Sequence, residues 1–103
     1  MHATGTVELD FRLTLTELSR GCGVEADRIL LLVDAGLLEP TGADPHEWLF
    51  AASDLYRARC ALRLQHDLGI NTPGAALAVD LIEELQRTRR RLQLLEALFD
   101  RNC

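Results

Sequence analysis

The sequence predicts a mostly α-helical fold: a winged helix-turn-helix with a small β-hairpin wing, followed by one long C-terminal helix. Two short helical segments are separated by glycines, an extended segment with a turn follows them, and an uninterrupted helical pattern covers the last third of the chain. We expect a winged helix-turn-helix domain over residues 1–69 and a packing or dimerisation helix over residues 70–103. Because 103 residues support only one modest core, the two parts should form one structural unit.

The first two elements, a strand and a helix, are predicted from local sequence patterns. Residues 7–13 alternate apolar and charged side chains, which is typical of a half-buried strand. Thr14 and Glu17 then fit the capping-box pattern, in which each side chain accepts a hydrogen bond from the backbone N–H of the other residue. A short helix should follow and end near Arg20 or Cys22, where neighbouring glycines favour termination.

The middle of the chain carries the signals of a second helix and of the wing. Residues 24–35 form a helical pattern with acids in the first turn, and Gly36 suits the position after its end. Residues 37–40 leave the helix extended, residues 41–45 form a turn cluster, and residues 48–50 are a short strand candidate. The two extended pieces together predict the β-hairpin.

Two longer helices complete the prediction. The third helix covers residues 52–68 and stops at Gly69. Thr72 as the N-cap and Pro73 at N1, the first helical position, start the fourth helix, which runs to about Asp100. This helix would be roughly 40 Å long, which is more than a lone domain of this size needs.

The long helix carries an apolar seam with the a/d spacing of a heptad repeat, interrupted by one polar residue, Thr88. Its distal half has little else in the chain to pack against, so we expect a homodimer through this helix. The alternative is a helix that packs only on its own domain. The expected dimerisation residues are Ala78, Leu81, Leu85, Leu92, Leu95 and Phe99.

Charge and composition narrow the function. The chain has 16 acidic residues against 11 basic ones, all arginine, and its net charge of −5 favours a basic protein partner over nucleic acid. No apolar run reaches the ~20 residues that span a bilayer, and no signal-peptide pattern opens the chain, so we expect a cytoplasmic protein. Its three cysteines show no CxxC spacing, and no metal-ligand or nucleophile–base pattern occurs. We therefore expect no cofactor, metal or enzymatic activity.

Several short motifs follow the order expected of a DNA-binding regulator. They are Leu15-Thr16-Glu17-Leu18, Gly23-Val24, Gly36-Leu37-Leu38-Glu39-Pro40, Phe50 with Asp54-Leu55, and Leu68-Gly69-Ile70. Over most of its length the sequence resembles the MerR-type regulators, dimers that bind operator DNA with the second helix and the wing. The cations needed for phosphate contacts are missing, however. The expected recognition helix holds three acids against Arg28 alone, and the wing over residues 44–50 holds two acids and no arginine.

Four segments point to a more specific resemblance. They are residues 36–40, the Trp-Leu-Phe of residues 48–50, residues 62–70, and the Pro-Gly start of an acidic helix rich in Ala and Leu over residues 73–85. From about Val7 to Phe99 the sequence resembles the chaperone modulator CbpM family. The resemblance implies a protein that binds the J-domain of the DnaJ-like co-chaperone CbpA and blocks its stimulation of the DnaK ATPase. The alternative function is that of a MerR-type DNA-binding transcriptional regulator.

A J-domain offers a basic helix to DnaK, so a competing surface should be acidic and exposed. Two groups of acids qualify, one on the second helix and one on the first turns of the long helix. The sequence does not decide which of them binds the J-domain. The candidates are Glu25, Asp27 and Asp34 in the first group and Asp80, Glu83 and Glu84 in the second. Trp48 is either a wing residue packed on the core or a partly exposed apolar anchor for the partner.

Overall fold

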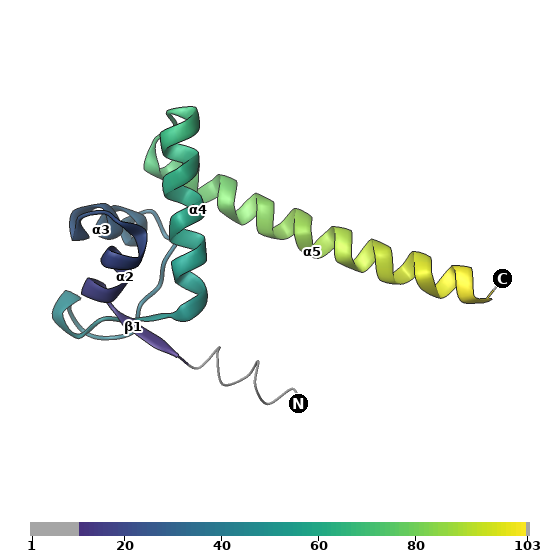
Figure 1. Ribbon diagram of the computed structural model, residues 1–103, viewed down its shortest axis with the longest axis horizontal. Helices are drawn as coiled ribbons and strands as arrows, with labels where there is room; N and C mark the ends of the chain where they lie inside the picture. The colour runs from purple at the N-terminus through teal and green to yellow at the C-terminus, as the bar shows by residue number, and fades with distance from the viewer. Residues whose placement is uncertain (1–10, 103) are drawn as a thin grey trace.

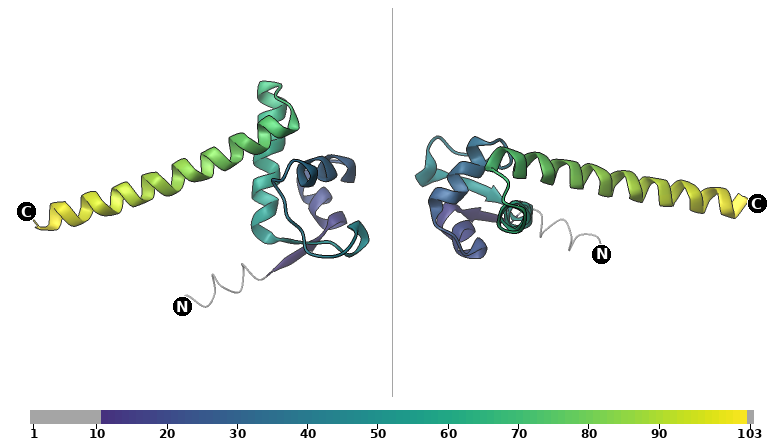
Figure 2. Two further views of the ribbon diagram at one scale, coloured as in Figure 1. Left: turned by 180° about the vertical axis from the view of Figure 1, so that it is seen from behind. Right: turned by 90° about the horizontal axis from the view of Figure 1, so that it is seen from above.

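The computed structural model describes residues 11–102 as a compact head from which one long helix projects (Figure 1). Both further views show the same separation between the head and the free end of this helix (Figure 2). The molecule measures 56 × 36 × 22 Å along its principal axes. The elements are β1 (Arg12–Thr14), α2 (Leu15–Cys22), α3 (Ala26–Asp34), the 3-10 turn η1 (Pro45–Glu47), β2 (Leu49–Ala51), α4 (Ala52–Leu68) and α5 (Thr72–Asn102).

The predicted capping box at the start of α2 is confirmed. The backbone N–H of Thr14 donates to Glu17 Oε1 at 2.9 Å, and the N–H of Glu17 donates to Thr14 Oγ1 at 3.1 Å. Gly23 ends the helix in the left-handed conformation, with φ of 70°. Of the strand expected over residues 7–13, residues 7–10 lie outside the described part of the chain.

The small sheet joins segments that are far apart in the sequence. β1 pairs antiparallel with β2, with Leu13 opposite Phe50, so that α2 and α3 lie between the two strands along the chain. The wing itself is a single antiparallel bridge between Thr41 and Leu49, whose backbone N–H groups each donate to the other residue's carbonyl at 3.0 Å. The extended piece expected over residues 37–40 forms no strand.

The reason is that the chain enters the core at this point. Leu37 and Leu38 are adjacent and both fully buried, which a half-buried strand with alternating faces does not allow. Pro40, which lacks an N–H group, follows immediately. The first arm of the hairpin is therefore Thr41, the residue after Pro40, and not the expected residues 37–40.

The start of α3 lies two residues after the predicted Val24, because Glu25 is the N-cap; of the other helix ends, two agree with the sequence and one differs. Gly36, with φ of 84°, follows α3, and Gly69, with φ of 67°, follows α4, as predicted. At the start of α5 the predicted N-cap, Thr72, is wrong. Asn71 takes this role, because its Oδ1 accepts from the N–H of Gly74 at 2.8 Å. The hydroxyl of Thr72 instead accepts from Gln65 Nε2 at 3.1 Å, which ties α5 to α4.

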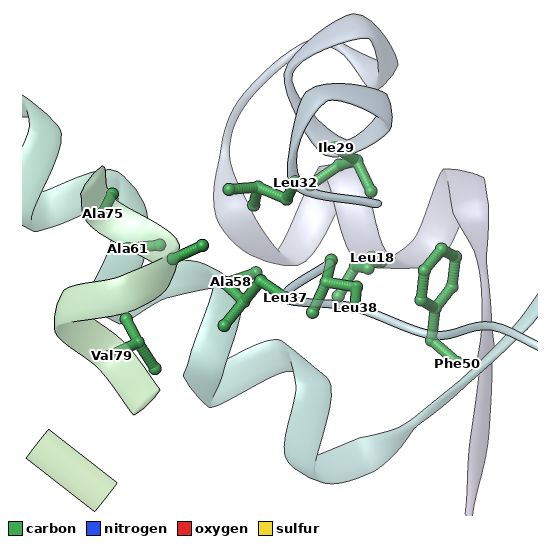
Figure 3. Packing of buried hydrophobic residues seen from close by; sticks show 11 residues of the cluster. Leu18, Ile29, Leu32, Leu37, Leu38, Phe50, Ala58, Ala61, Ala75 and Val79 are labelled. Atoms are coloured by element: carbon green, nitrogen blue, oxygen red, sulfur yellow. The ribbon is translucent and has the colours of Figure 1, made fainter. Parts of the chain in front are cut away.

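The core gathers side chains from every helix of the head and from the first turns of α5 (Figure 3). Leucine, isoleucine and phenylalanine fill the space between α2, α3 and β2, while alanines line the crossing of α4 and α5. Small side chains let these two helices approach closely, which fixes the direction in which α5 leaves the head. The buried apolar residues are Leu18, Ile29, Leu32, Leu37, Leu38, Phe50, Ala58, Ala61, Ala75, Ala76 and Val79.

The outer part of α5 has no such packing. Every side chain from residue 84 to residue 101 is exposed to solvent. Within residues 11–102, no helix is both long and apolar enough to cross a membrane.

Candidate partner-binding surfaces

The first acidic group lies on the exposed side of α3. Glu25 is the residue before the helix, and Asp27 lies in its first turn, where a negative charge favours the positive end of the helix dipole. Asp34 follows Asp27 by seven residues, so the two carboxylates share one face two turns apart. Leu31 lies between them on this face with 47% of its surface exposed. We call these three acids and Leu31 the acidic α3 surface.

The carboxylates of this surface are not neutralised within the head. The ion pairs found among residues 11–102 include none with Glu25, Asp27 or Asp34. A shallow hollow of about 620 Å³ between α2 and α3 borders Glu25 and Asp27, and the side chains of Arg20 and Arg28 also line it. The acidic α3 surface is thus open to a partner, with two cations at one margin.

The second acidic group is organised by a residue that the sequence analysis did not identify, Arg57 of α4. Its Nη2 lies 2.9 Å from Asp80 Oδ1, and its Nε lies 2.9 Å from Glu83 Oε2. Its Nη1 donates to the carbonyl of Leu37 at 2.7 Å and lies 3.8 Å from Asp54 Oδ1. One guanidinium therefore connects α4, α5 and the segment after α3.

This network changes the character of the second group. Asp80 and Glu83 are engaged with Arg57, and the Glu83 side chain is only 32% exposed. Glu84 is open to solvent, but its Oε1 lies 3.3 Å from Nη2 of Arg87. The three acids that the sequence placed in one patch are thus largely paired with cations, and local spacing could have indicated only the pair of Glu84 with Arg87. Arg57 precedes Glu83 by 26 residues.

Trp48 packs on the core and is also partly accessible, while its role as an anchor for a partner stays a prediction. Its ring packs edge-on against Phe50, with centroids 6.0 Å apart and planes at 89°, yet part of the residue remains accessible. The turn before it depends on Gly42, which has φ of 119° and lies so close to Glu47 that a Cβ would meet its carbonyl oxygen at 2.6 Å. Asp44 caps η1 by accepting from the N–H of His46 at 3.0 Å.

Two groups of the head, the buried Asp54 and the partly buried Cys22, have shifted pKa values. Burial raises the pKa of the Asp54 carboxyl above its ordinary value, although a backbone hydrogen bond at Ala51 and the charge of Arg57 oppose this shift. Burial also raises the pKa of the Cys22 thiol, which disfavours the reactive thiolate. In the described part of the chain, no three His, Cys, Asp or Glu side chains are grouped as metal ligands.

Comparison of the sequence with known proteins identifies the family of this chain. The sequence matches the MerR HTH family of regulatory proteins over residues 13–97. It is 36% identical over 90 residues to the chaperone modulatory protein CbpM of Coxiella burnetii, an alignment that covers 87% of this chain and 85% of the relative. The chain belongs to the CbpM family. Within the same family, the Pseudomonas putida and Pseudomonas entomophila proteins are 34% and 33% identical over 101 residues, or 98% of this chain and 96% of each relative.

The predicted seam of this CbpM family member lies on the side of α5 that faces away from α4. Ala75 and Val79 mark the face that packs on the head, and the heptad positions fall on roughly the opposite side of the helix. Ala78, at the start of the seam, is half-buried. The exposed fractions of the other seam residues run from 44% at Leu95 to 70% at Phe99, with Leu81, Leu85 and Leu92 between them.

Proposed function

We propose that this CbpM family member binds the J-domain of a DnaJ-like co-chaperone of the CbpA type and inhibits its co-chaperone activity. The observation that carries the proposal is the acidic α3 surface, which occupies the place where a MerR-type regulator would present its recognition helix. Its three unpaired carboxylates are complementary to the basic helix that a J-domain offers to DnaK. Occupying that helix would prevent the productive contact between the co-chaperone and DnaK.

The acidic α3 surface fits this role better than the acids of α5. Asp80 and Glu83 would have to release Arg57 before they could pair with a partner, and that exchange gains little free energy. On α3, by contrast, Leu31 supplies an apolar centre between Asp27 and Asp34. An apolar centre with charged groups around it is the usual composition of a protein–protein interface.

Two further groups complete the proposed contact set. The accessible part of Trp48 offers a second apolar anchor on the wing. Glu84 is the one acid of the α5 group that could add long-range attraction, although Arg87 lowers the local charge. Such peripheral charges act mainly on the association rate and weaken as salt increases.

We also propose that the functional form is a homodimer through the seam of α5. Leu81, Leu85, Leu92, Leu95 and Phe99 are exposed in the single chain. A second copy would remove these side chains from water and so provide the free energy of association. The dimer would present two acidic α3 surfaces, one on each head.

Operator binding is the competing function, because the MerR match covers most of the chain. It requires cations at the reading helix, since phosphate contacts are made chiefly by lysine and arginine. Arg28 is the only basic residue within α3, and it is accompanied by Asp27 and Asp34. We therefore expect no sequence-specific DNA binding at about 0.15 M salt.

The test measures binding to a purified CbpA-type co-chaperone by calorimetry, together with the DnaK ATPase that this co-chaperone stimulates. Asp27→Lys with Asp34→Lys should weaken binding at least tenfold at about 0.05 M salt, or roughly 1.4 kcal/mol, and by less at about 0.5 M. The matched control is Asp67→Lys with Asp100→Lys, which makes the same charge change away from α3. The control should bind within about twofold of the wild type.

Two results would contradict the proposal. The first is equal weakening in both double variants, which would mean that only net charge matters. The second is nanomolar protection of a palindromic DNA site by the wild-type protein in a footprinting assay, which would support the operator-binding function instead.

A further inference from the structure

The angle between α4 and α5 contains a groove that the acidic surfaces do not explain. Two adjoining hollows of about 210 and 400 Å³ lie between the two helices, and a third of about 310 Å³ beside them is lined by α4 residues alone; Tyr56 lines all three. The floor is apolar where the two helices diverge, with Cys60 on α4 and with Val79 and Ile82 on α5. We call this feature the α4–α5 groove.

The rim of the α4–α5 groove is cationic in a protein whose net charge is −5. Arg59 and Arg63 line the adjoining hollow on α4, and Arg87 and Arg90 line the α5 side of the groove. All four side chains are exposed to solvent. The one acid in the lining, Glu83, is engaged by Arg57, and Arg87 is paired with Glu84, so Arg59, Arg63 and Arg90 carry the net positive charge of the rim.

The side chain at the centre of the groove is suited to contact with a partner. Tyr56 keeps 71% of its surface exposed, which is unusual for the largest residue on its face of the helix. An aromatic ring with a polar tip provides a large contact area with little loss of conformational entropy, and tyrosine is enriched among residues that dominate binding energy. The arginines around it would exclude water and supply charge.

We propose that the α4–α5 groove binds an acidic polypeptide segment that inserts at least one apolar side chain beside Tyr56. The cationic rim selects an anionic partner, and the apolar floor selects one that also carries hydrocarbon side chains. A nucleic-acid backbone satisfies only the first condition. A duplex would in addition be repelled by the net negative charge of the protein.

The dimensions of the groove fit a short segment. On α5 its lining extends from Val79 to Arg90, which at 1.5 Å per residue is about 16 Å. This length corresponds to about three turns of a bound helix. The hollows are of side-chain size, so the partner contributes individual anchors and not a broad flat surface.

The α4–α5 groove is independent of the proposed J-domain site and of the proposed dimer seam. The acidic α3 surface has the opposite charge and lies on another helix. Val79 and Ile82 lie on the side of α5 next to α4, whereas Leu81 and Leu85 face roughly the opposite way. A dimer through the seam would therefore leave both grooves accessible.

Fluorescence anisotropy on the full chain tests this proposal with a labelled helical peptide of about 12 residues, built from Glu, Leu and Phe with one apolar face. We compare it with a peptide in which Ser replaces Leu and Phe, and with a labelled single-stranded oligonucleotide of similar charge. At about 0.05 M salt the amphipathic peptide should bind at least tenfold more tightly than either of the other two ligands. The difference isolates the contribution of the apolar floor.

Protein variants then locate the site. Arg63→Glu with Arg90→Glu should weaken peptide binding at least tenfold, whereas Arg20→Glu with Arg28→Glu, an equal charge change on α2 and α3, should weaken it less than threefold. Tyr56→Ser should weaken it about fivefold or more, and its folding is not at risk because the ring is exposed. Circular dichroism confirms that each variant is folded.

The outcomes separate the possible partners. Equal affinity for the oligonucleotide would overturn the proposal in favour of phosphate binding, and equal affinity for the serine peptide would overturn the role of the apolar floor. Unchanged binding by Tyr56→Ser and by the groove double variant would place the peptide elsewhere. J-domain binding by the groove variants is measured in parallel and should be unchanged, so failure of this proposal is distinct from failure of the proposed function.

Discussion

The head and the outer part of α5 use the same kind of residue in opposite ways. In the head, leucines such as Leu18 and Leu32 are completely buried against neighbouring elements. In the outer part, Leu85 and Leu92 are about half exposed, because no other element of the described residues 11–102 lies beside them. Both regions are helical and both are rich in leucine, so composition alone does not separate them.

The length of the helices and the turns that connect them distinguish the two regions. The helices of the head are short, and each one turns back at a glycine so that its apolar face meets another part of the chain. α5 continues for 31 residues without a turn, which carries its outer half away from the head (Figure 1). Among the described residues, no other element covers the apolar side that is repeated along the outer part of α5. The apolar residues of the head are therefore buried within a single chain. We propose that those of the α5 seam are buried by a second copy.

The largest expected effect comes from placing charge on the seam. Leu85→Asp together with Leu92→Asp should convert the proposed dimer to monomers at tens of micromolar, as measured by sedimentation velocity. Four leucine side chains lose their burial in each dimer, and at about 1.5 kcal/mol for each the loss is about 6 kcal/mol. That free energy corresponds to a dissociation constant raised roughly ten-thousandfold or more.

A matched variant distinguishes the seam from general surface hydrophobicity. Leu94 lies on the same helix between two seam residues but outside the heptad positions, and it is 67% exposed. Leu94→Asp should remain dimeric. If the wild-type chain is itself a monomer at tens of micromolar, the seam is not a dimer interface.

Local signals account for the parts of the fold that the sequence predicted well. The capping box of Thr14 and Glu17 involves residues three positions apart, and Gly36 and Gly69 act on the helices that they follow. Each of these features depends on backbone conformation within a few residues. Thr72 is the exception, because Asn71 competes for the same cap and a long-range bond from Gln65 engages the threonine hydroxyl.

Features that depend on distant contacts could not be predicted in this way. The pairing of β1 with β2 requires knowledge of how α2 and α3 fold between them. In the candidate sites, Glu25, Asp27 and Asp34 are as exposed as expected, but the pairing of Arg57 with Asp80 and Glu83 spans 23 and 26 residues. Tyr56 was missed because its exposure depends on the angle at which α5 leaves α4.

An intermediate effect is expected where the two regions are joined. Arg57→Met should destabilise the head by about 2–3 kcal/mol in urea unfolding, because Asp80, Glu83 and the carbonyl of Leu37 lose a shared charged donor. Arg57→Lys should restore only part of this loss, since one ammonium group cannot reproduce the forked geometry.

The control for this junction is Arg59→Met, an exposed position two residues later on the same helix. It should change stability by less than about 0.5 kcal/mol. Adding Asp80→Asn and Glu83→Gln to Arg57→Met should cost much less than the sum of the separate effects, because these groups form one network. Simple additivity would show that the contacts of Arg57 contribute independently.

The smallest expected effect is the pH dependence contributed by Asp54, inside the head. Burial raises its pKa above the ordinary value of 3.8, so the folded chain binds a proton at this carboxyl more tightly than the unfolded chain. The stability contribution of this group therefore increases as pH falls through the raised folded pKa toward the ordinary value of 3.8, and it is lost again as pH rises. This sign is opposite to that of a carboxylate stabilised by its ion pair.

Asp54→Asn removes the titration while keeping a side-chain oxygen that can accept the hydrogen bond at Ala51. The measurement is the free energy of unfolding of wild type and variant at about pH 7 and about pH 4, with Asp34→Asn as the exposed control. On acidification the wild type should gain stability relative to Asp54→Asn, and the control should show no such gain. A relative loss at Asp54 would mean that the charge of Arg57 outweighs burial and that this carboxylate belongs to the ion-pair network that joins the head to α5.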